Sequence, residues 1–239
     1  MSDHVKEILA LLEQCTEEQR KAVFDGLRKN IAIHPVERTL KTSAEIILQA
    51  ISKDEKGLTF RMLRGVIAEA AFELEVVKHL KSWSSLTATG DRAYDYLRDD
   101  GQGQVSVQVK LQRSKEFKPM TARQANRKFP DGMWVVETQK TRGGKDSENA
   151  DTRPYRFGEF DILAVAMQPS TGDWSKFMYC VSAWLRPDPS DKTRINKFQP
   201  VATKPGDIWT DSFEECVQRL RSKEAKFNSV VGDPPGLFG

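Results

Sequence analysis

The sequence has 239 residues and a mass of 27.1 kDa, and its 37 Lys and Arg residues against 34 Asp and Glu residues give a formal net charge of +3. Hydrophobic residues make up 38% and charged residues 30%, which excludes an intrinsically disordered chain, and the length allows a sizeable core. The longest apolar run is too short to cross a bilayer, the first residues lack a secretion signal, and three widely spaced cysteines form neither a disulfide framework nor a zinc site. We therefore expect a cytoplasmic protein without a membrane partner.

The first quarter of the sequence is predicted to be helical. An apolar pattern at helical spacing predicts a helix over residues 2–12, and the capping-box signature that begins at Thr16 predicts a second one. Thr42 with Glu45 repeats that signature before another apolar stretch. Residues 1–57 are therefore expected to form an N-terminal helical arm.

A longer helix is predicted from about Thr59 to Lys81. Glu69 and Glu73 lie one turn apart beside its apolar side, so either carboxylate can reach toward a neighbouring sheet, and we favour Glu69. The apolar face is predicted to consist of Leu63, Val66, Ile67, Ala70, Leu74 and Val77.

Beyond Trp83 the pattern changes to short β-rich segments, with a closing helix at about Ser212–Lys226 and a loose tail over residues 230–239. Helices followed by strands and a final helix indicate an α+β (mixed α/β) fold in which helices flank a central mixed β-sheet. The predicted strands are Leu86–Thr89, Tyr94–Leu97, Val105–Leu111, Met133–Thr138, Phe160–Met167, Phe177–Leu185 and Gln199–Thr203.

The hairpin formed by the second and third of these strands holds residues that can bind a divalent cation. Side chains alternate along a strand, so Gln108 and Lys110 project from one face, and Asp95 can meet them from the neighbouring strand. A carboxylate, an amide oxygen and the Val109 backbone carbonyl are hard oxygen ligands. A nearby lysine can orient or deprotonate an attacking water and stabilise charge on a phosphate. These groups are the ones that hydrolysis of a phosphodiester requires.

Three further aspartates lie near the hairpin. Asp99 and Asp100 fall at its turn, where aspartate favours turn formation. Asp91 remains the alternative to Asp95 as a metal ligand. Motifs of other enzyme classes are missing, since the sequence contains no HExxH, P-loop, GxSxG or paired CxxC pattern.

The charge of the chain is unevenly distributed along the sequence. Residues 110–145 carry a net charge of +7 and the remaining residues carry −4. This concentration favours a polyanionic partner, with a solvated surface loop as the alternative. The amide and basic side chains in and after this segment suit base edges and phosphates. The residues expected to contact DNA are Arg113, Lys115, Arg123, Gln124, Asn126, Arg127, Lys128, Lys140, Arg142, Arg153 and Arg156.

Over residues 65–112 the sequence resembles the PD-(D/E)xK nuclease superfamily, specifically type II restriction endonucleases. Tyr94-Asp95 stands where that family has Pro-Asp, and Gln108-Val109-Lys110 stands where it has Glu-x-Lys. The stretch Gly65–Glu69 resembles the family's preceding helix, which often carries a Glu near the metal. Gln108 departs from the pattern because it replaces an anionic ligand.

The resemblance implies a restriction-endonuclease-like catalytic core over residues 58–229 and a Mg²⁺-dependent enzyme that cleaves double-stranded DNA at a specific site as a homodimer. Asp95, Gln108 and Val109 would hold the metal, Lys110 would position the water and Glu69 would assist. The arm would then mediate dimerisation or wrap DNA. Alternatives are a non-catalytic DNA-binding module on the same fold, a repair or junction-resolving nuclease, and a protein-interaction scaffold with a basic loop. Residue types alone do not define a recognition sequence or a cut position.

Overall fold

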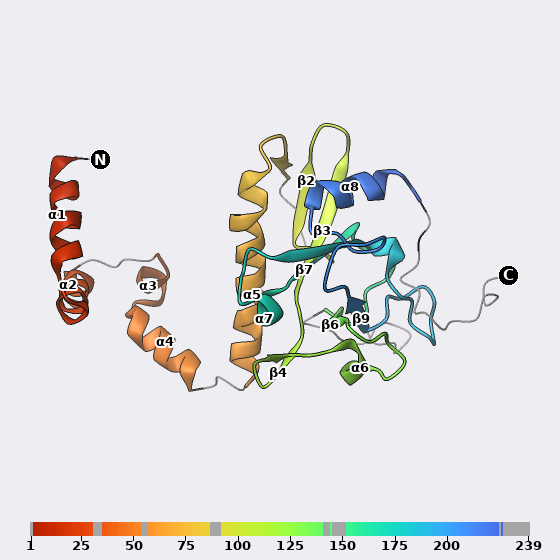
Figure 1. Ribbon diagram of the computed structural model, residues 1–239, viewed down its shortest axis with the longest axis horizontal. Coiled ribbons are helices and arrows are strands. Elements are labelled where there is room, and N and C mark those ends of the chain that lie inside the picture. Colours follow the sequence, from red (N-terminus) through yellow and green to blue (C-terminus); the bar gives the residue numbers. More distant parts are fainter. Residues whose placement is uncertain are drawn as a thin grey trace. The chain divides into compact units, whose positions relative to one another are not determined.

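A computed structural model of the chain describes residues 2–30, 35–53, 57–86, 92–140, 144, 152–224 and 226 (Figure 1). The chain divides into two compact units, Met1–Phe60 and Arg61–Gly239. Of the helices in the described ranges, none is long and apolar enough to cross a membrane.

The first unit consists of the helices α1 (Asp3–Gln14), α2 (Glu17–Asn30), α3 (Pro35–Leu40) and α4 (Ala44–Ser52). The capping box before α2 is confirmed, because the Gln19 N–H donates to Thr16 Oγ1 and the Thr16 N–H donates to Gln19 Oε1. The cap predicted at Thr42 is wrong. Ser43 caps α4 instead, its Oγ accepting from the Ile46 N–H at 3.4 Å.

The helices of the first unit bury little of their own apolar surface. Among residues 2–28 and 35–53, whose burial the structure describes, none is buried. An amphipathic helix normally covers its apolar side with another element, so these sides remain open for a partner. The exposed large apolar residues are Val5, Ile8, Leu9 and Leu11 on α1, Val23, Phe24 and Leu27 on α2, Val36 and Leu40 on α3, and Ile46 and Leu48 on α4.

The second unit is built on a five-stranded sheet in the order β1-β2-β3-β7-β8. Only β3 and β7 pair in parallel among these neighbours, and the other pairs are antiparallel, so the expected α+β fold with a mixed central sheet flanked by helices is confirmed. The strands are β1 (Ser84–Ser85), β2 (Tyr96–Asp99), β3 (Gln104–Leu111), β7 (Ile162–Ala166) and β8 (Phe177–Val181).

Smaller elements surround this sheet. Two short ladders join β4 (Ser114–Lys115) to β5 (Lys118–Pro119) and β6 (Trp134–Glu137) to β9 (Phe198–Val201). The helical elements are α5 (Leu58–Glu75), α6 (Ala122–Ala125), α7 (Gln168–Thr171) and α8 (Phe213–Arg221), with single 3₁₀ turns at Val77–His79 and Ser182–Trp184.

Phe72 of α5 joins the helices to the sheet. Its ring lies 5.2 Å from that of Tyr96 on β2, 5.5 Å from that of Phe177 on β8 and 6.0 Å from that of Phe213 on α8. The Phe177 and Phe213 rings pack edge to face against Phe72 and the Tyr96 ring is tilted to it, so the cluster buries a large apolar area. Helix α5 is therefore fixed alongside the sheet, as Figure 1 shows.

The buried face of α5 differs from the predicted one. Ala68, Ala71 and Phe72 are buried, whereas Val66 and Leu74 are 58% and 49% exposed. The prediction followed the largest aliphatic residues. The structure instead turns two alanines to the sheet because small side chains allow the helix backbone to approach closely.

The strand predictions are confirmed most closely where the alternation is longest, at β3. The strand expected at Leu86–Thr89 is observed as β1 at Ser84–Ser85, and residues 87–89 lie outside the described ranges. The strand expected at Tyr94–Leu97 is observed two residues later, as β2.

Candidate active site

The candidate site lies where β2 and β3 part. Their pairing runs from Asp99 opposite Gln104 to Tyr96 opposite Val107. Continued pairing would set Tyr94 opposite Val109, but the Val109 N–H instead donates to Asp95 Oδ2 at 2.7 Å. Asp95 lies just outside β2, where the ladder has ended. Its side chain can therefore accept a hydrogen bond from a backbone group of β3.

Gln108 completes this arrangement from β3 itself. Its Nε2 donates to Asp95 Oδ2 at 2.6 Å and to the Val109 carbonyl at 3.1 Å. In a β-strand the N–H and C=O of one residue point the same way, so both polar groups of Val109 face Asp95. The expected meeting of Asp95 and Gln108 is therefore seen in the geometry.

The Asp95 carboxylate is held against β3 although the residue as a whole keeps surface open to solvent. Crowding by protein atoms raises the pKa of Asp95, and this effect is opposed by the Val109 N–H and then by the nearby Lys110 charge. An aspartate in this setting presents a hard anionic oxygen next to an amine.

Lys110 projects from β3 beside the two acids. Burial lowers the pKa of the Lys110 ammonium, whereas the charges of Asp95 and Glu69 raise it. Its Nζ also lies 5.3 Å from the centroid of the Tyr155 ring, a cation–π contact. An amine whose pKa is lowered by burial can hold a water and exchange a proton with it.

Glu69 approaches the site from α5. Burial raises the pKa of Glu69, the neighbouring charge of Asp95 raises it further, and Lys110 lowers it. The Tyr96 hydroxyl donates to the Glu69 main-chain oxygen at 2.8 Å and fixes this turn of α5 next to β2. Glu73, the alternative, is exposed.

The donor set fits Mg²⁺ without being an all-carboxylate site. Within the described ranges, no group of three His, Cys, Asp or Glu residues could hold a metal ion. Mg²⁺ commonly binds through one or two carboxylates and completes its shell with waters and substrate oxygens. Asp95 and the Val109 carbonyl supply hard oxygens of that kind, whereas Gln108 faces both of them with its Nε2.

Other aspartates singled out in the sequence have structural partners. Asp99 and Asp100 accept the backbone N–H groups of Gly101 and Gln102, which confirms their expected turn roles. Asp161 Oδ2 accepts from the Ser106 N–H at 2.8 Å and from Ser106 Oγ at 2.6 Å. Asp91 lies outside the described residues.

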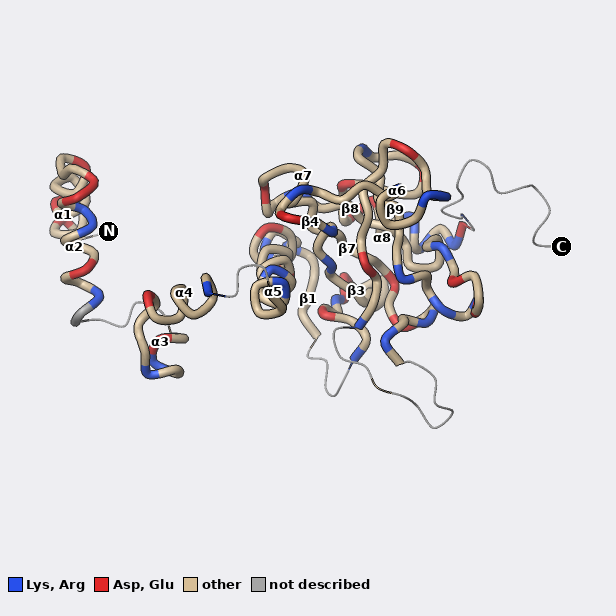
Figure 2. Tube along the Cα trace, turned by 90° about the horizontal axis from the view of Figure 1, so that it is seen from below, with Lys and Arg blue, Asp and Glu red and all other residues tan. Residues whose placement is uncertain are grey.

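Several of the residues expected to contact DNA are engaged within the protein. Arg113 is ion-paired with Glu137, Arg123 lies 2.9 Å from Asp131, and Lys140 lies 2.7 Å from Glu159. In Figure 2, acidic residues stand among the basic ones around the second unit. Glu137 and Asp131 belong to the segment and are already counted in its +7, so Glu159 is the acidic partner among these three that lies outside it.

The remaining basic and amide candidates lie at the surface. The Gln124 side chain closes a capping box with Thr121, and Asn126 Oδ1 accepts from the Lys128 N–H. Gln124 and Asn126 therefore each stabilise the local backbone, in addition to the base contacts expected of them. The exposed basic candidates are Lys115, Arg123, Arg127, Lys128, Arg153 and Arg156, and Arg142 lies outside the described residues.

Tyr155 is a site residue whose role the sequence does not reveal. In the structure the ring is 4% exposed, and both Lys110 Nζ and Lys140 Nζ lie over it, at 5.3 and 5.4 Å from its centroid. Residues 110 and 155 are joined only through the tertiary fold, so no local spacing predicts this contact.

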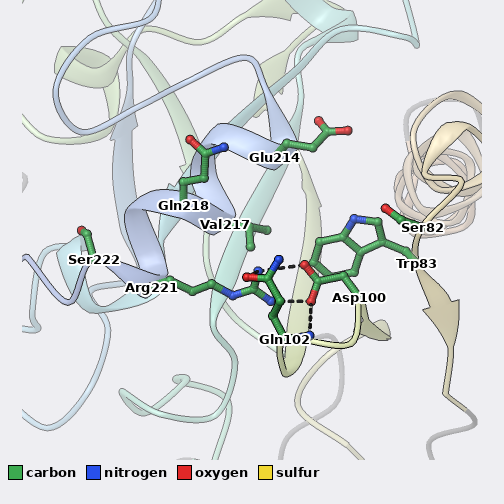
Figure 3. Close-up of a pocket in the computed structure, with 9 residues that line it drawn as sticks. All are labelled: Ser82, Trp83, Asp100, Gln102, Glu214, Val217, Gln218, Arg221 and Ser222. Carbon is green, nitrogen blue, oxygen red and sulfur yellow. Dashed lines mark hydrogen bonds and ion pairs between the residues drawn. The ribbon is translucent and has the colours of Figure 1, made fainter.

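A hollow of about 550 Å³ lies elsewhere, at the turn end of the β2–β3 hairpin (Figure 3). Trp83, Asp100 and Gln102 line one side of it, and α8 lines the other. Arg221 of α8 makes two ion-pairing contacts with Asp100, at 2.6 and 2.8 Å, and lies over the Trp83 ring. Because these charges neutralise each other, we interpret this hollow as part of the junction between the hairpin and α8.

Comparisons with known proteins are sparse. No family profile and no curated protein matches the chain. Among solved structures, a bacterial homing endonuclease, I-Ssp6803I, is similar over 51% of this chain and 68% of its own, with 23% sequence identity and a TM-score of 0.33. A likeness this partial is no evidence of function.

Proposed function

We propose that this protein is a Mg²⁺-dependent endonuclease that hydrolyses phosphodiester bonds in double-stranded DNA, as a type II restriction enzyme of the PD-(D/E)xK kind. One observation carries the proposal. A carboxylate, an amide, a backbone carbonyl and a partly buried lysine converge at the point where β2 and β3 part, with a second carboxylate approaching from α5.

Each group has a defined task in this proposal. Asp95, the Val109 carbonyl and Gln108 hold Mg²⁺, which supplies positive charge to the phosphate undergoing attack. Lys110 holds the attacking water and stabilises developing negative charge, as its position beside both acids and over Tyr155 supports. Glu69, whose raised pKa favours the protonated form more than usual, accepts or donates a hydrogen bond at the same water.

The exposed basic residues supply phosphate contacts, and the chain acts as a homodimer because cutting both strands of a symmetric site needs two active sites. Residues 1–57 contain ten acidic and nine basic residues. A nearly neutral arm is poorly suited to wrapping DNA, and its open apolar sides favour dimerisation.

Two substitutions test the catalytic assignment. Asp95→Ala and Lys110→Ala should each reduce Mg²⁺-dependent plasmid cleavage by at least a thousandfold, because one removes the anionic ligand and the other removes the group that holds the water. Both should still bind DNA in Ca²⁺. Lys192→Ala, at an exposed loop lysine, serves as the matched control. Full cleavage by either site variant contradicts the proposal.

A non-catalytic DNA-binding module is the second candidate, and the single observation that favours it is Gln108, which leaves the hairpin with one acidic ligand. Nicking assays with Mg²⁺ or Mn²⁺ separate the two functions, since a module binds DNA without nicking. Linear, mismatched and branched duplexes tested side by side distinguish a restriction enzyme from a repair or junction-resolving nuclease.

A further inference from the structure

The Gln108 side chain has an unusual position among the proposed ligands. Its Nε2 lies between two oxygens, 2.6 Å from Asp95 Oδ2 and 3.1 Å from the Val109 carbonyl. A carboxylate and a carbonyl oxygen are both acceptors, so only the NH₂ end of the amide can face them. Gln108 is 3% exposed, which gives its two donors little access to water.

The same two oxygens are the ones that the proposed function assigns to the cation. An N–H group and a cation use the same lone pairs, so they compete for Asp95 Oδ2 and the Val109 carbonyl. The amide oxygen, in contrast, is a cation ligand. Because the last torsion of glutamine is broad and roughly twofold, turning the amide over exchanges Nε2 for Oε1 without moving β3.

We propose that the Gln108 side-chain amide turns over when a cation binds, and that it stabilises the site both with and without the cation. Without a cation its NH₂ group donates to Asp95 and Val109 and holds them in position. When a cation binds, the amide turns over and presents Oε1 to it. This inference rests on the proposed function and adds a regulatory step to the same site.

The exchange also explains what a glutamine offers at this position. A glutamate would place a second carboxylate about as close to Asp95 as Nε2 is now, and like charges at that distance repel unless a cation lies between them. Glutamine thus keeps the ligands ordered before the cation arrives. The accompanying cost is weaker cation binding, since two hydrogen bonds must first be broken.

NMR of the full chain labelled with ¹⁵N-glutamine tests directly whether the Gln108 amide turns over when a cation binds. Loss of one side-chain amide signal pair in Gln108→Met assigns Gln108. Gln199 is the matched control, because it is buried and its Nε2 also donates to two carbonyls, those of Arg186 at 2.9 Å and Asn196 at 3.0 Å. In EDTA, the NH₂ protons of both residues should exchange slowly with solvent.

Calorimetry first establishes the Mg²⁺ concentration that saturates the protein. At that concentration the Gln108 NH₂ protons should shift and exchange at least tenfold faster, while those of Gln199 should not change. Gln108→Glu should bind Mg²⁺ at least tenfold more tightly than the wild type, and Gln199→Glu should bind it equally well.

The outcomes separate this inference from the function on which it rests. Saturable Mg²⁺ binding that Asp95→Ala abolishes, together with unchanged Gln108 signals, overturns the exchange and leaves the proposed site standing. Failure of the wild-type chain to bind Mg²⁺, or equal binding by Asp95→Ala, overturns the proposed metal site and the exchange with it. Weaker Mg²⁺ binding by a folded Gln108→Glu also contradicts the exchange.

Discussion

Tyr155 supports Lys110 through its ring, over which the Lys110 ammonium lies. The buried ring lies under the ammonium groups of Lys110 and Lys140, and Lys140 is in turn tied to Glu159. Burial raises the pKa of the Tyr155 hydroxyl, so the side chain stays neutral and acts through its ring at ordinary pH. A cation–π contact shielded from water contributes roughly 2 kcal/mol.

Replacing the ring should therefore impair catalysis more than removing the hydroxyl. Tyr155→Leu is expected to slow single-turnover cleavage by about tenfold, because Lys110 loses a contact worth on the order of 1–2 kcal/mol. Tyr155→Phe keeps the ring and should retain most of the rate. Equal loss in both variants contradicts a role for the ring and points to the hydroxyl.

At the scale of residues, only part of the candidate site could be predicted from the sequence. Asp95, Gln108 and Lys110 were predictable because one local hairpin brings them together and strand alternation sets their common face. Tyr155 and Glu159 reach the site only through pairings that close the whole second unit. The hydrogen bonds of Gln108 Nε2 to Asp95 and to the Val109 carbonyl could not be predicted either, since they depend on where the β2–β3 ladder ends.

At the scale of elements, α5 depends on Phe72 for its attachment to the sheet. Phe72→Ala is expected to lower the free energy of unfolding by about 3–5 kcal/mol, because it empties the centre of an aromatic cluster. Urea denaturation measures the change. Phe117→Ala is the control, since that ring is 52% exposed and its loss should cost little. Similar effects of the two substitutions contradict the assigned core.

The hairpin and α8 are joined by an ion pair that makes stability depend on pH. The Arg221 guanidinium lowers the pKa of Asp100 to about 2. A carboxylate with a depressed pKa stabilises the fold fully above its ordinary value near 3.8, and loses this contribution as the pH falls toward 2. Asp100→Asn should thus lower the melting temperature at pH 7.

Thermal denaturation of wild type and Asp100→Asn between pH 7 and pH 2 measures this contribution, and the difference should shrink below about pH 4. Asp207→Asn, at an exposed aspartate, controls for general loss of negative charge. A difference that stays constant down to pH 2 contradicts the ion pair as its source.

The elements show why the fold was predictable in outline and not in detail. Strand β3 alternates over eight residues and was predicted to within one. The buried face of α5 was missed because Ala68 and Ala71 carry little hydrophobic signal, although their size is what allows close packing. Two-residue strands such as β4 and β5 have too few residues to form any pattern.

At the scale of the whole molecule, the proposed homodimer would cover the open apolar sides of α1 and α2. A variant that combines Leu9→Asp with Phe24→Asp should be monomeric at concentrations where the wild type is dimeric, because both residues are about half exposed and apolar. Sedimentation velocity measures this. A variant that combines Glu7→Lys with Asp25→Lys, at exposed polar residues of the same helices, serves as the control. A wild type that sediments as a monomer contradicts the prediction.

The parallel pairing of β3 with β7 has a consequence for when the proposed site is assembled. Val107 of β3 lies opposite Ile162 of β7, so β3 gains its second neighbour only after a long loop has closed. A nascent chain that ends before Ile162 already carries Asp95, Gln108 and Lys110, yet its β3 still lacks the strand that completes the sheet. Synthesis thus delays assembly of the proposed site until most of the second unit has left the ribosome, so under the proposed function a partly made chain would not cut the DNA around it.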